Sequence, residues 1–127
     1  MSTQSIPVIS QPFQGVSFQT DDFTSLNTTG TSTDFTFVND GYTVLYLVTF
    51  LTGAETSDLT ITSVPDNAAR LGNIAQHFAL ADTGNVYQYG PFRPIWWNYG
   101  GVVRCSFANS AALAADEIQA LAVRYTF

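Results

Sequence analysis

Few residues in this chain have side chains that support catalysis, and their positions do not form a recognisable catalytic set. The chain has one histidine, His77, and one cysteine, Cys105, so a cysteine–histidine pair is the one thiol nucleophile it could assemble. In the strands expected there, His77 faces away from the large apolar side chains, whereas Cys105 shares a face with Val103 and Phe107. A buried cysteine behaves as a small hydrophobe, so we expect no thiol catalysis.

The acidic residues support neither glycoside hydrolysis nor a metal site. Glu55 and Glu117 could be considered as a carboxylate pair, but nothing in the sequence links one to the other. Oxygen ligands for calcium could come from Asp21, Asp22, Asp58, Asp66, Asn67, Asp82 and Asn85. These residues lack the spacing of an EF-hand, and Asp and Asn commonly hydrogen-bond their own backbone in turns. The sequence therefore predicts a protein that is not an enzyme and has no metal or cofactor.

The charge pattern excludes two classes of partner. The chain has no lysine, four scattered arginines and a formal net charge of −6. Binding to nucleic acid or to an anionic membrane requires clustered basic residues, so neither is expected. Charged residues make up 11% of the chain, against about 25% in an ordinary soluble domain. Such a low fraction favours a protein that is held in an assembly, because a lone monomer relies on charge for solubility.

The most distinctive segment is the aromatic corner at residues 90–102. Pro91 and Pro94 fix their own φ angles and bias the preceding residues toward extended conformations, so this segment is expected to be pre-ordered. Its aromatic side chains are Phe92, Trp96, Trp97 and Tyr99, with Tyr87 and Tyr89 just before them. Three interpretations remain open: a plug for the core, a protein interface rich in Trp, Tyr and Arg, or a flat platform for a sugar ring.

Alternation with period two places most of these residues on strands. The expected strands are Val16–Thr20, Asp34–Val38, Tyr42–Leu51, Asp58–Val64, Ile74–Leu80, Val86–Tyr89, Gly101–Phe107 and Leu121–Phe127. Asp40–Gly41 is a two-residue turn signal, which predicts that Tyr42–Leu51 is the return strand of a hairpin. In the Ala-rich run Ser110–Ile118 we expect one short helical turn at most. The pattern predicts an all-β fold, an antiparallel β-sandwich or jelly roll of seven or eight strands.

Domain organisation follows from composition. Residues 16–127 form the single β-sandwich domain, and residues 1–15, with Pro7, Pro12 and Gly15, form an extended N-terminal arm. The arm is either a frayed terminus or a segment that lies on a neighbouring subunit. Both faces of Tyr42–Leu51 are largely apolar, so a second surface must be covered, by a loop or by another subunit.

From the sequence we expect neither a secretion signal nor a membrane-spanning helix. The first residues lack the basic and apolar regions of a signal peptide. The longest apolar run, Tyr42–Leu51, is shorter than the roughly 20 residues of a membrane-spanning helix. We therefore expect the protein to fold in a cytoplasm.

Three motifs follow one another along the chain. They are an Asn-Asp-Gly turn that opens an apolar strand (39–47), a Gly-Pro-Phe-x-Pro corner (90–94) and a glycine before a Val-rich strand (100–103). Together they resemble small jelly-roll or tulip-like β proteins of tailed-phage heads. The match covers about residues 34–127. The Trp96–Trp97 pair and the Thr-rich segment 20–33 depart from the pattern.

The resemblance implies a capsid decoration, or cement, protein on the outer surface of the virion, made in the host cytoplasm. Such a protein commonly sits as a homotrimer that bridges subunits of the major capsid protein. The residues expected to contact the capsid or the trimer partners are Ile6, Val8, Ile9, Phe13, Tyr42, Tyr46, Leu47, Phe92, Arg93, Trp96, Trp97 and Tyr99. Alternatives are a tail or head-fibre component, and a carbohydrate-binding module that stacks sugars on Trp96, Trp97 and Tyr99.

Overall fold

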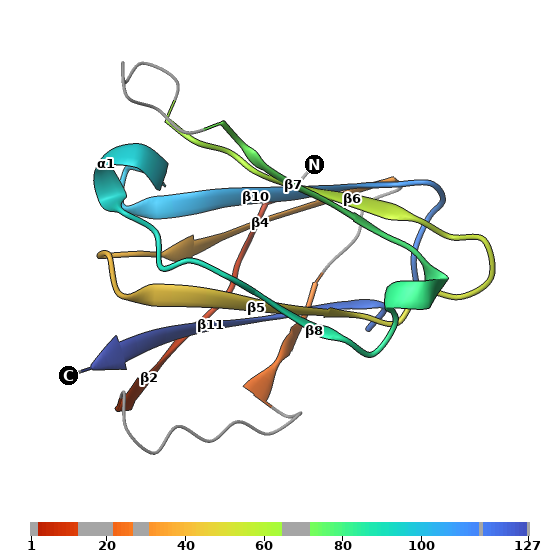
Figure 1. Cartoon of the computed structure of the whole chain (residues 1–127), viewed down its shortest axis with the longest axis horizontal. Coiled ribbons are helices and arrows are strands. Elements are labelled where there is room, and N and C mark those ends of the chain that lie inside the picture. The colour runs from red at the N-terminus through yellow and green to blue at the C-terminus, as the bar shows by residue number, and fades with distance from the viewer. Residues whose placement is uncertain (1–2, 13–21, 27–30, 65–71, 115, 127) are drawn as a thin grey trace.

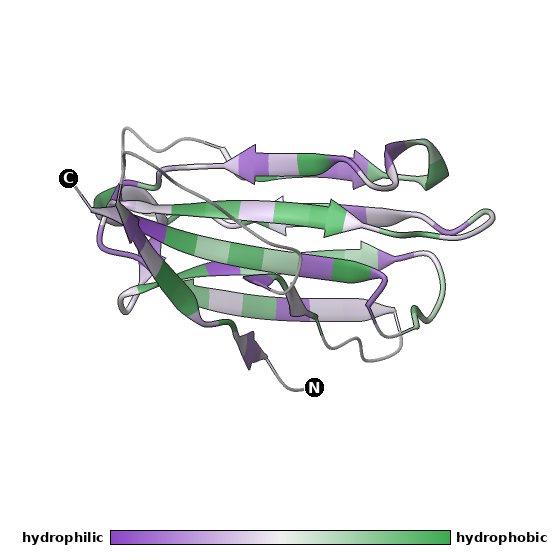
Figure 2. Cartoon of the chain, turned by 90° about the horizontal axis from the view of Figure 1, so that it is seen from below, coloured by the Kyte–Doolittle hydropathy of each residue, from purple (hydrophilic) through white to green (hydrophobic). Residues whose placement is uncertain are grey.

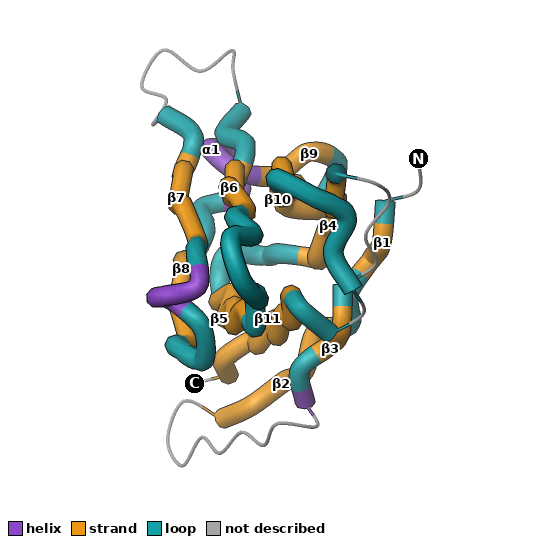
Figure 3. Tube along the Cα trace, turned by 90° about the vertical axis from the view of Figure 1, so that its right-hand side faces the viewer, coloured by secondary structure: helices purple, strands orange, loops and turns teal. Residues whose placement is uncertain are grey.

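Two β-sheets pack face to face in the computed structural model, which describes residues 3–12, 22–26, 31–64, 72–114 and 116–126 (Figure 1). In order across the first sheet lie β1 (Gln4–Ser5), β4 (Ser32–Val38), β10 (Val102–Asn109), β6 (Ser57–Ile61) and β7 (Ile74–Phe78), with β9 (Asn98–Tyr99) paired to β10. The second sheet has β2 (Val8–Pro12), β11 (Ile118–Thr126), β5 (Thr43–Thr49) and β8 (Val86–Tyr89), with β3 (Thr24–Ser25) paired to β11. Figure 3 shows the two layers in cross-section. The predicted all-β sandwich is confirmed.

Aromatic side chains fill the space between the sheets. Buried and partly exposed residues alternate along β4 and β10, as the period-two pattern requires, and Figure 2 shows apolar and polar bands alternating along the strands. Phe35, Phe78 and Phe107 are fully buried. Phe107 packs against both of the others, with ring centroids 6.1 Å from Phe35 and 5.9 Å from Phe78. All three rings come from the first sheet and contribute large apolar side chains to the core between the sheets.

The expected hairpin at Asp40–Gly41 is wrong. β4 pairs with β1 and β10 in the first sheet, whereas β5 pairs with β11 and β8 in the second, so residues 39–42 cross from one sheet to the other. A turn signal specifies that the chain reverses, but it does not specify that the two flanking strands pair. Here Phe37 and Leu45, one from each strand, are both buried in the common core.

Residues 3–12 of the predicted arm belong to the sheets of this same chain. β1 runs parallel to β4, and β2 runs parallel to β11, with Ile9 opposite Val123. The chain passes between the sheets at Ile6, whose N–H donates to the Thr36 carbonyl at 2.9 Å and whose side chain is 3% exposed. These parallel pairings make both sheets mixed rather than antiparallel, and the short strands raise the count to eleven. Phe13 and the expected strand Val16–Thr20 lie outside the described residues.

The apolar outer face of β5 is already covered within the single chain. Leu45 and Leu47 point into the core, while Val44 and Val48 on the opposite face are only 5% and 6% exposed. Of the two explanations considered for a two-faced strand, burial inside the chain accounts for these side chains. The strand therefore does not require a second subunit.

The short helical turns lie elsewhere than the sequence allowed for. The described residues between 110 and 118 contain no helix; instead Ser110 exchanges backbone and side-chain hydrogen bonds with Thr56. A single helical turn, α1 (Pro94–Trp97), forms in the aromatic corner, and a short 3₁₀ turn covers Leu80–Asp82. Pro94 occupies the first position of α1, where a missing N–H is tolerated.

We predict that Ile6→Ala lowers the free energy of unfolding by about 2–5 kcal/mol, because it opens a cavity where the chain joins the two sheets. Denaturant titration of the purified protein measures this change. Val86→Ala is the matched control, since Val86 is 59% exposed and surface changes stay within about 0.5 kcal/mol. An Ile6→Ala variant as stable as the control would contradict the placement of β1 and β2 in the fold.

Candidate functional site

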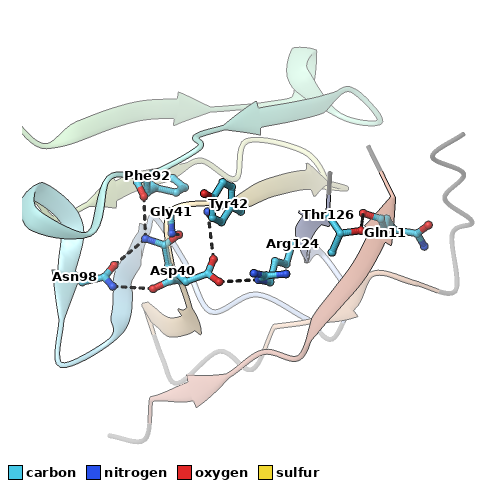
Figure 4. A network of polar contacts seen from close by, with 9 residues as sticks. Gln11, Asp40, Gly41, Tyr42, Phe92, Asn98, Arg124 and Thr126 are labelled. Atoms are coloured by element: carbon cyan, nitrogen blue, oxygen red, sulfur yellow. Dashed lines mark hydrogen bonds and ion pairs between the residues drawn. The ribbon is translucent and has the colours of Figure 1, made fainter. Parts of the chain in front are cut away.

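Three separate segments meet at one end of the sandwich. They are the crossing between β4 and β5, the segment from Gly90 to Gly101 that contains α1, and the last residues of β11 (Figure 1). All three segments carry residues named in the sequence as candidates for contact with partners. Figure 4 shows the polar contacts that join them.

The side chain of Asn39 ties the crossing to the aromatic corner. Its Nδ2 donates to the Phe92 carbonyl at 3.0 Å and to Asn98 Oδ1 at 2.8 Å, while its Oδ1 accepts the Gly41 N–H at 3.0 Å (Figure 4). Asn98 Nδ2 donates back to the Asn39 carbonyl at 2.7 Å, and the Asn39 N–H donates to the Gly101 carbonyl at 3.1 Å. Asn39 is 4% exposed, so a buried amide holds both segments in place.

Two glycines with positive φ angles lie in the crossing and at the start of the aromatic corner. Gly41 has a φ of +105°, and a Cβ there would lie 3.5 Å from Pro94 Cδ. Gly90 has a φ of +98°, and a Cβ there would lie 2.7 Å from Phe92 Cε2. Both positions require a backbone conformation that other residues rarely adopt, which explains why glycine begins the corner and ends the crossing.

Part of the aromatic corner is core. Phe92 is 1% exposed and Trp97 is 5% exposed, with their ring centroids 5.6 Å apart, and Phe92 also packs against Phe37. Four residues expected at an interface are therefore buried inside this chain, namely Ile6, Leu47, Phe92 and Trp97. The core-plug interpretation holds for the two aromatic residues, because α1 turns them inward beneath its own single turn.

Arginine side chains cover the rings that remain accessible. The Arg93 guanidinium lies 4.6 Å from the centroid of Trp96, and the Arg104 guanidinium lies 4.2 Å from that of Tyr99. With Trp97 buried and the other two rings each facing an arginine, residues 96, 97 and 99 do not present the flat platform expected for a sugar ring. Cation–π contacts of this kind fix the arginines in defined orientations.

An ion pair stands at the open side of the crossing. Arg124 Nε donates to Asp40 Oδ2 at 2.7 Å, and its guanidinium also lies over the ring of Tyr42 at 5.7 Å (Figure 4). The hydrogen bond from Arg124 holds the pKa of the Asp40 carboxyl below its usual value. The ring of Tyr42 is thereby oriented at the surface.

We name as the end surface a set of five residues with exposed or half-buried side chains: Val38, Tyr42, Arg93, Ile95 and Trp96. Val38 is 60%, Tyr42 50% and Ile95 66% exposed. Sequence reasoning found three of the five and missed Val38 and Ile95. Both could have been found, since Val38 occupies the outward phase of β4 and Ile95 follows the proline that begins α1.

Three further expected contact residues, Val8, Ile9 and Tyr46, lie in β2 and β5 of the second sheet and not in the end surface. Val8 and Ile9 are half-buried in β2, where Val8 packs against the core. The hydroxyl of Tyr46 is hydrogen-bonded to that of Tyr125. The pKa of Tyr46 is raised, mainly because the side chain is partly buried and also because of this hydrogen bond. The twelve residues therefore do not form one continuous surface.

The candidate catalytic residues do not come together. Cys105 is 4% exposed and faces the core, and burial raises the pKa of its thiol well above the usual value. His77 is exposed on the outer face of β7 beside Asp58, with β6 between β7 and β10. No group of three or more metal-binding side chains is found among the described residues.

The fold brings together Glu55 and Glu117, which nothing in the sequence links. Hydrogen bonding between the two carboxyl groups lowers the pKa of Glu55 and raises the pKa of Glu117. Glu55 Oε1 accepts the Thr52 N–H at 3.0 Å, and Glu117 Oε1 accepts the Ala114 N–H at 2.8 Å. Glu117 Oε2 is buried and has no hydrogen-bond donor among the described residues.

This carboxyl pair joins two loops at the end of the sandwich opposite α1. Its members are in direct contact, whereas the two carboxyls of a retaining glycosidase stand about 5 Å apart with the substrate between them. The arrangement is therefore suited to holding the loops before β6 and β11 together rather than to glycoside hydrolysis.

We predict that Asn39→Ala lowers the free energy of unfolding by about 2–4 kcal/mol, because it leaves the Phe92 carbonyl and Asn98 without their buried donor. Thermal or denaturant unfolding measures the loss. Asp40→Asn is the matched control in the adjacent position; it weakens an exposed ion pair that contributes about 0–1 kcal/mol. Equal effects of the two variants would contradict a central role for the Asn39 amide.

We also predict that unfolding depends on pH through the carboxyl pair. Because Glu117 has a raised pKa in the folded protein, its contribution to stability is full below its ordinary value of 4.5 and is lost as the pH rises through the raised value. Glu55, with a lowered pKa, loses its contribution only as the pH falls through that lowered value. Glu117→Gln supplies a permanent donor and should remove the loss of melting temperature above pH 4.5.

The matched control for this experiment is Asp116→Asn, which removes a neighbouring exposed carboxyl and should keep the pH dependence. The measurement is the melting temperature of each variant across the acidic range. Parallel pH profiles for the wild type and Glu117→Gln would contradict a raised pKa of Glu117 in the folded protein.

Similarity to known proteins gives no information on function, so a functional conclusion rests on the arrangement of the residues described above. No protein-family model, curated protein or solved structure matches the chain. No helix among the described residues is long and apolar enough to span a membrane. The end surface is the feature whose composition points most directly to a partner.

Proposed function

We propose that this protein is a virion structural protein, a capsid decoration or cement protein that bridges subunits of the major capsid protein on the outside of a phage head. The observation that carries the proposal is the end surface, where Val38, Tyr42 and Ile95 are at least half exposed on a rigid support. Tryptophan, tyrosine and arginine are the residues most enriched at the energetic centres of protein interfaces. The end surface contains one of each.

The arrangement of the three phage-like motifs supports the same proposal. The Asn-Asp-Gly turn, the Gly-Pro-Phe-x-Pro corner and the Gly-Gly pair lie far apart in sequence, yet hydrogen bonds from Asn39 reach Phe92 in the second motif and Gly101 in the third. Their joint occurrence thus has a physical reason, since each builds part of one end of the sandwich. A surface constructed from the shared motifs is a reasonable place for a shared function.

Rigidity makes the end surface suited to stable attachment. Binding loses free energy when side chains and loops must be ordered at the interface, and a pre-ordered surface avoids much of that loss. Here Pro91 and Pro94 restrict the backbone, the Asn39 amide fixes the crossing, and arginines restrain the rings of Trp96 and Tyr42. Cementing a shell requires this property, because the added contacts must resist the pressure of the packaged genome.

In this mechanism the protein contributes buried area at the junctions between capsid subunits. The proposed homotrimer would place three end surfaces on the shell and so bind several capsid subunits at once. The low content of charged residues agrees with a molecule that spends its working life in such an assembly.

The first test is the copy number of the polypeptide in purified virus particles, measured by quantitative mass spectrometry against the major capsid protein. Copies in the hundreds support a shell component. A few copies per particle would replace this proposal with a tail or head-fibre role, and absence from particles would overturn it.

We predict that Ile95→Asp weakens binding to capsids by about tenfold or more, since burying an unpaired carboxylate at an interface costs well over 1.4 kcal/mol. Co-sedimentation of the purified variant with particles that lack the protein measures the effect. Leu80→Asp is the matched control, because Leu80 is 53% exposed in the 3₁₀ turn at the other end of the molecule. Equal binding by both variants would exclude the end surface as the contact.

A further inference from the structure

A polar groove of about 600 Å³ lies on the outer face of the first sheet. The side chains that line it come from β4, from β10 and from the residues beside β1 and β6. The polar members of the lining are Thr3, Asp34, Thr36, Thr62, Arg104 and Ser106, and Phe35, Val102 and Cys105 complete it. None of the polar residues belongs to the end surface, and none was singled out in the sequence as a site.

The register of β4 and β10 accounts for this polar lining. Arg104 lies opposite Thr36, and Ser106 lies opposite Asp34, so the outward phases of the two strands place four polar side chains in adjacent pairs. The inward phases of the same strands are buried in the core. The groove is thus a fixed product of strand pairing.

Within the part of the chain that the structure describes, the polar side chains of the groove leave most of their hydrogen-bonding capacity unused. Among the described residues, no hydrogen bond or ion pair involves the side chain of Asp34, Arg104 or Ser106. The hydroxyls of Thr36 and Thr62 likewise have no internal partner in the described parts of the chain. A carboxylate, a guanidinium and several hydroxyls therefore face the same space with their hydrogen-bonding capacity open.

Arg104 is held in position for binding. Its guanidinium lies 4.2 Å from the ring centroid of Tyr99, and the Tyr99 hydroxyl donates a hydrogen bond to the Ser63 carbonyl. This stacking restricts the long side chain while leaving its N–H donors available. A restrained arginine loses less conformational entropy on binding than a free one.

We propose that this groove binds a saccharide chain. Sugar hydroxyls both donate and accept hydrogen bonds, and the groove offers an acceptor in Asp34, a set of donors in Arg104 and groups that do both in Thr36 and Ser106. Among the outward-facing side chains of this lining the apolar member is Val102, which is half-buried, whereas Phe35 and Cys105 are buried in the core. A lining with so little exposed apolar surface disfavours an apolar peptide, whose binding relies on large buried anchors. A phosphate ligand is disfavoured by the Asp34 carboxylate and the net charge of −6.

The inference is independent of the proposed attachment to a capsid, because the groove and the end surface share no residue. It also differs from the aromatic platform considered from the sequence, since recognition here rests on hydrogen bonds from the face of a sheet. A protein that failed to bind particles could still bind saccharide, and the reverse also holds.

The test begins with a glycan array probed with the purified wild-type protein. Cellopentaose, maltopentaose, chitopentaose and oligogalacturonate are then titrated into ¹⁵N-labelled protein and followed by backbone amide shifts. We expect at least one saccharide to shift the amides of Thr36, Arg104 and Ser106. Arg104→Ala and Asp34→Ala should each weaken that binding by about tenfold or more, which corresponds to the loss of charged hydrogen bonds.

His77→Ala is the matched control, because His77 is exposed on the same sheet face but outside the groove. Melting temperatures of all three variants establish that they fold. Absence of binding on the array and in every titration would overturn the proposal. So would saccharide binding that survives both groove substitutions, or that falls equally in His77→Ala, since either places the ligand elsewhere.

Discussion

The buried amide of Asn39 is the interaction on which this end of the sandwich depends. A buried polar group that loses its partner destabilises a protein by about 1–3 kcal/mol, so each bond of this amide restricts the positions of its neighbours. Through those bonds the crossing between the sheets, the Phe92 carbonyl and Asn98 can adopt only one mutual arrangement. The position of α1 follows, because it lies between Phe92 and Asn98 in the chain.

That arrangement decides which aromatic residues face inward. Once α1 is fixed against the core, its single turn directs Trp97 toward Phe92 and leaves Ile95 and Trp96 on the outside. The inward places at this end are taken by Phe37, Phe92 and Trp97, which pack against one another, while Ile95 and Trp96 lie outside. Packing at this end creates a rigid surface that water solvates poorly, and such a surface is suited to a protein partner.

The sequence was informative where structure is local and periodic. Alternation identified β4, β10 and β11 because each has one face in the core, and turn residues marked where the chain reverses. It was uninformative about pairing: the Asp40–Gly41 reversal leads to the other sheet, and β1 and β2 pair with strands distant in sequence. The Glu55–Glu117 contact escaped notice for the same reason, since only the folded chain brings those loops together. Val38 and Ile95, by contrast, were visible in the pattern and were overlooked.

β4 illustrates how one strand can serve several purposes. Its inward residues Phe35 and Phe37 build the core, its outward residues Asp34 and Thr36 line the polar groove, and its last residue, Val38, joins the end surface. All these outward residues lie on the same face of β4, so the two regions differ in chemistry because of their neighbours. Asp34 and Thr36 lie beside side chains of β10, whereas Val38 lies near the aromatic corner. Attachment through the end surface would leave the sheet face, which lies along the strands rather than at their ends, free for a second ligand. The same pairing that stabilises the sandwich thus separates a surface suited to protein from a surface suited to saccharide.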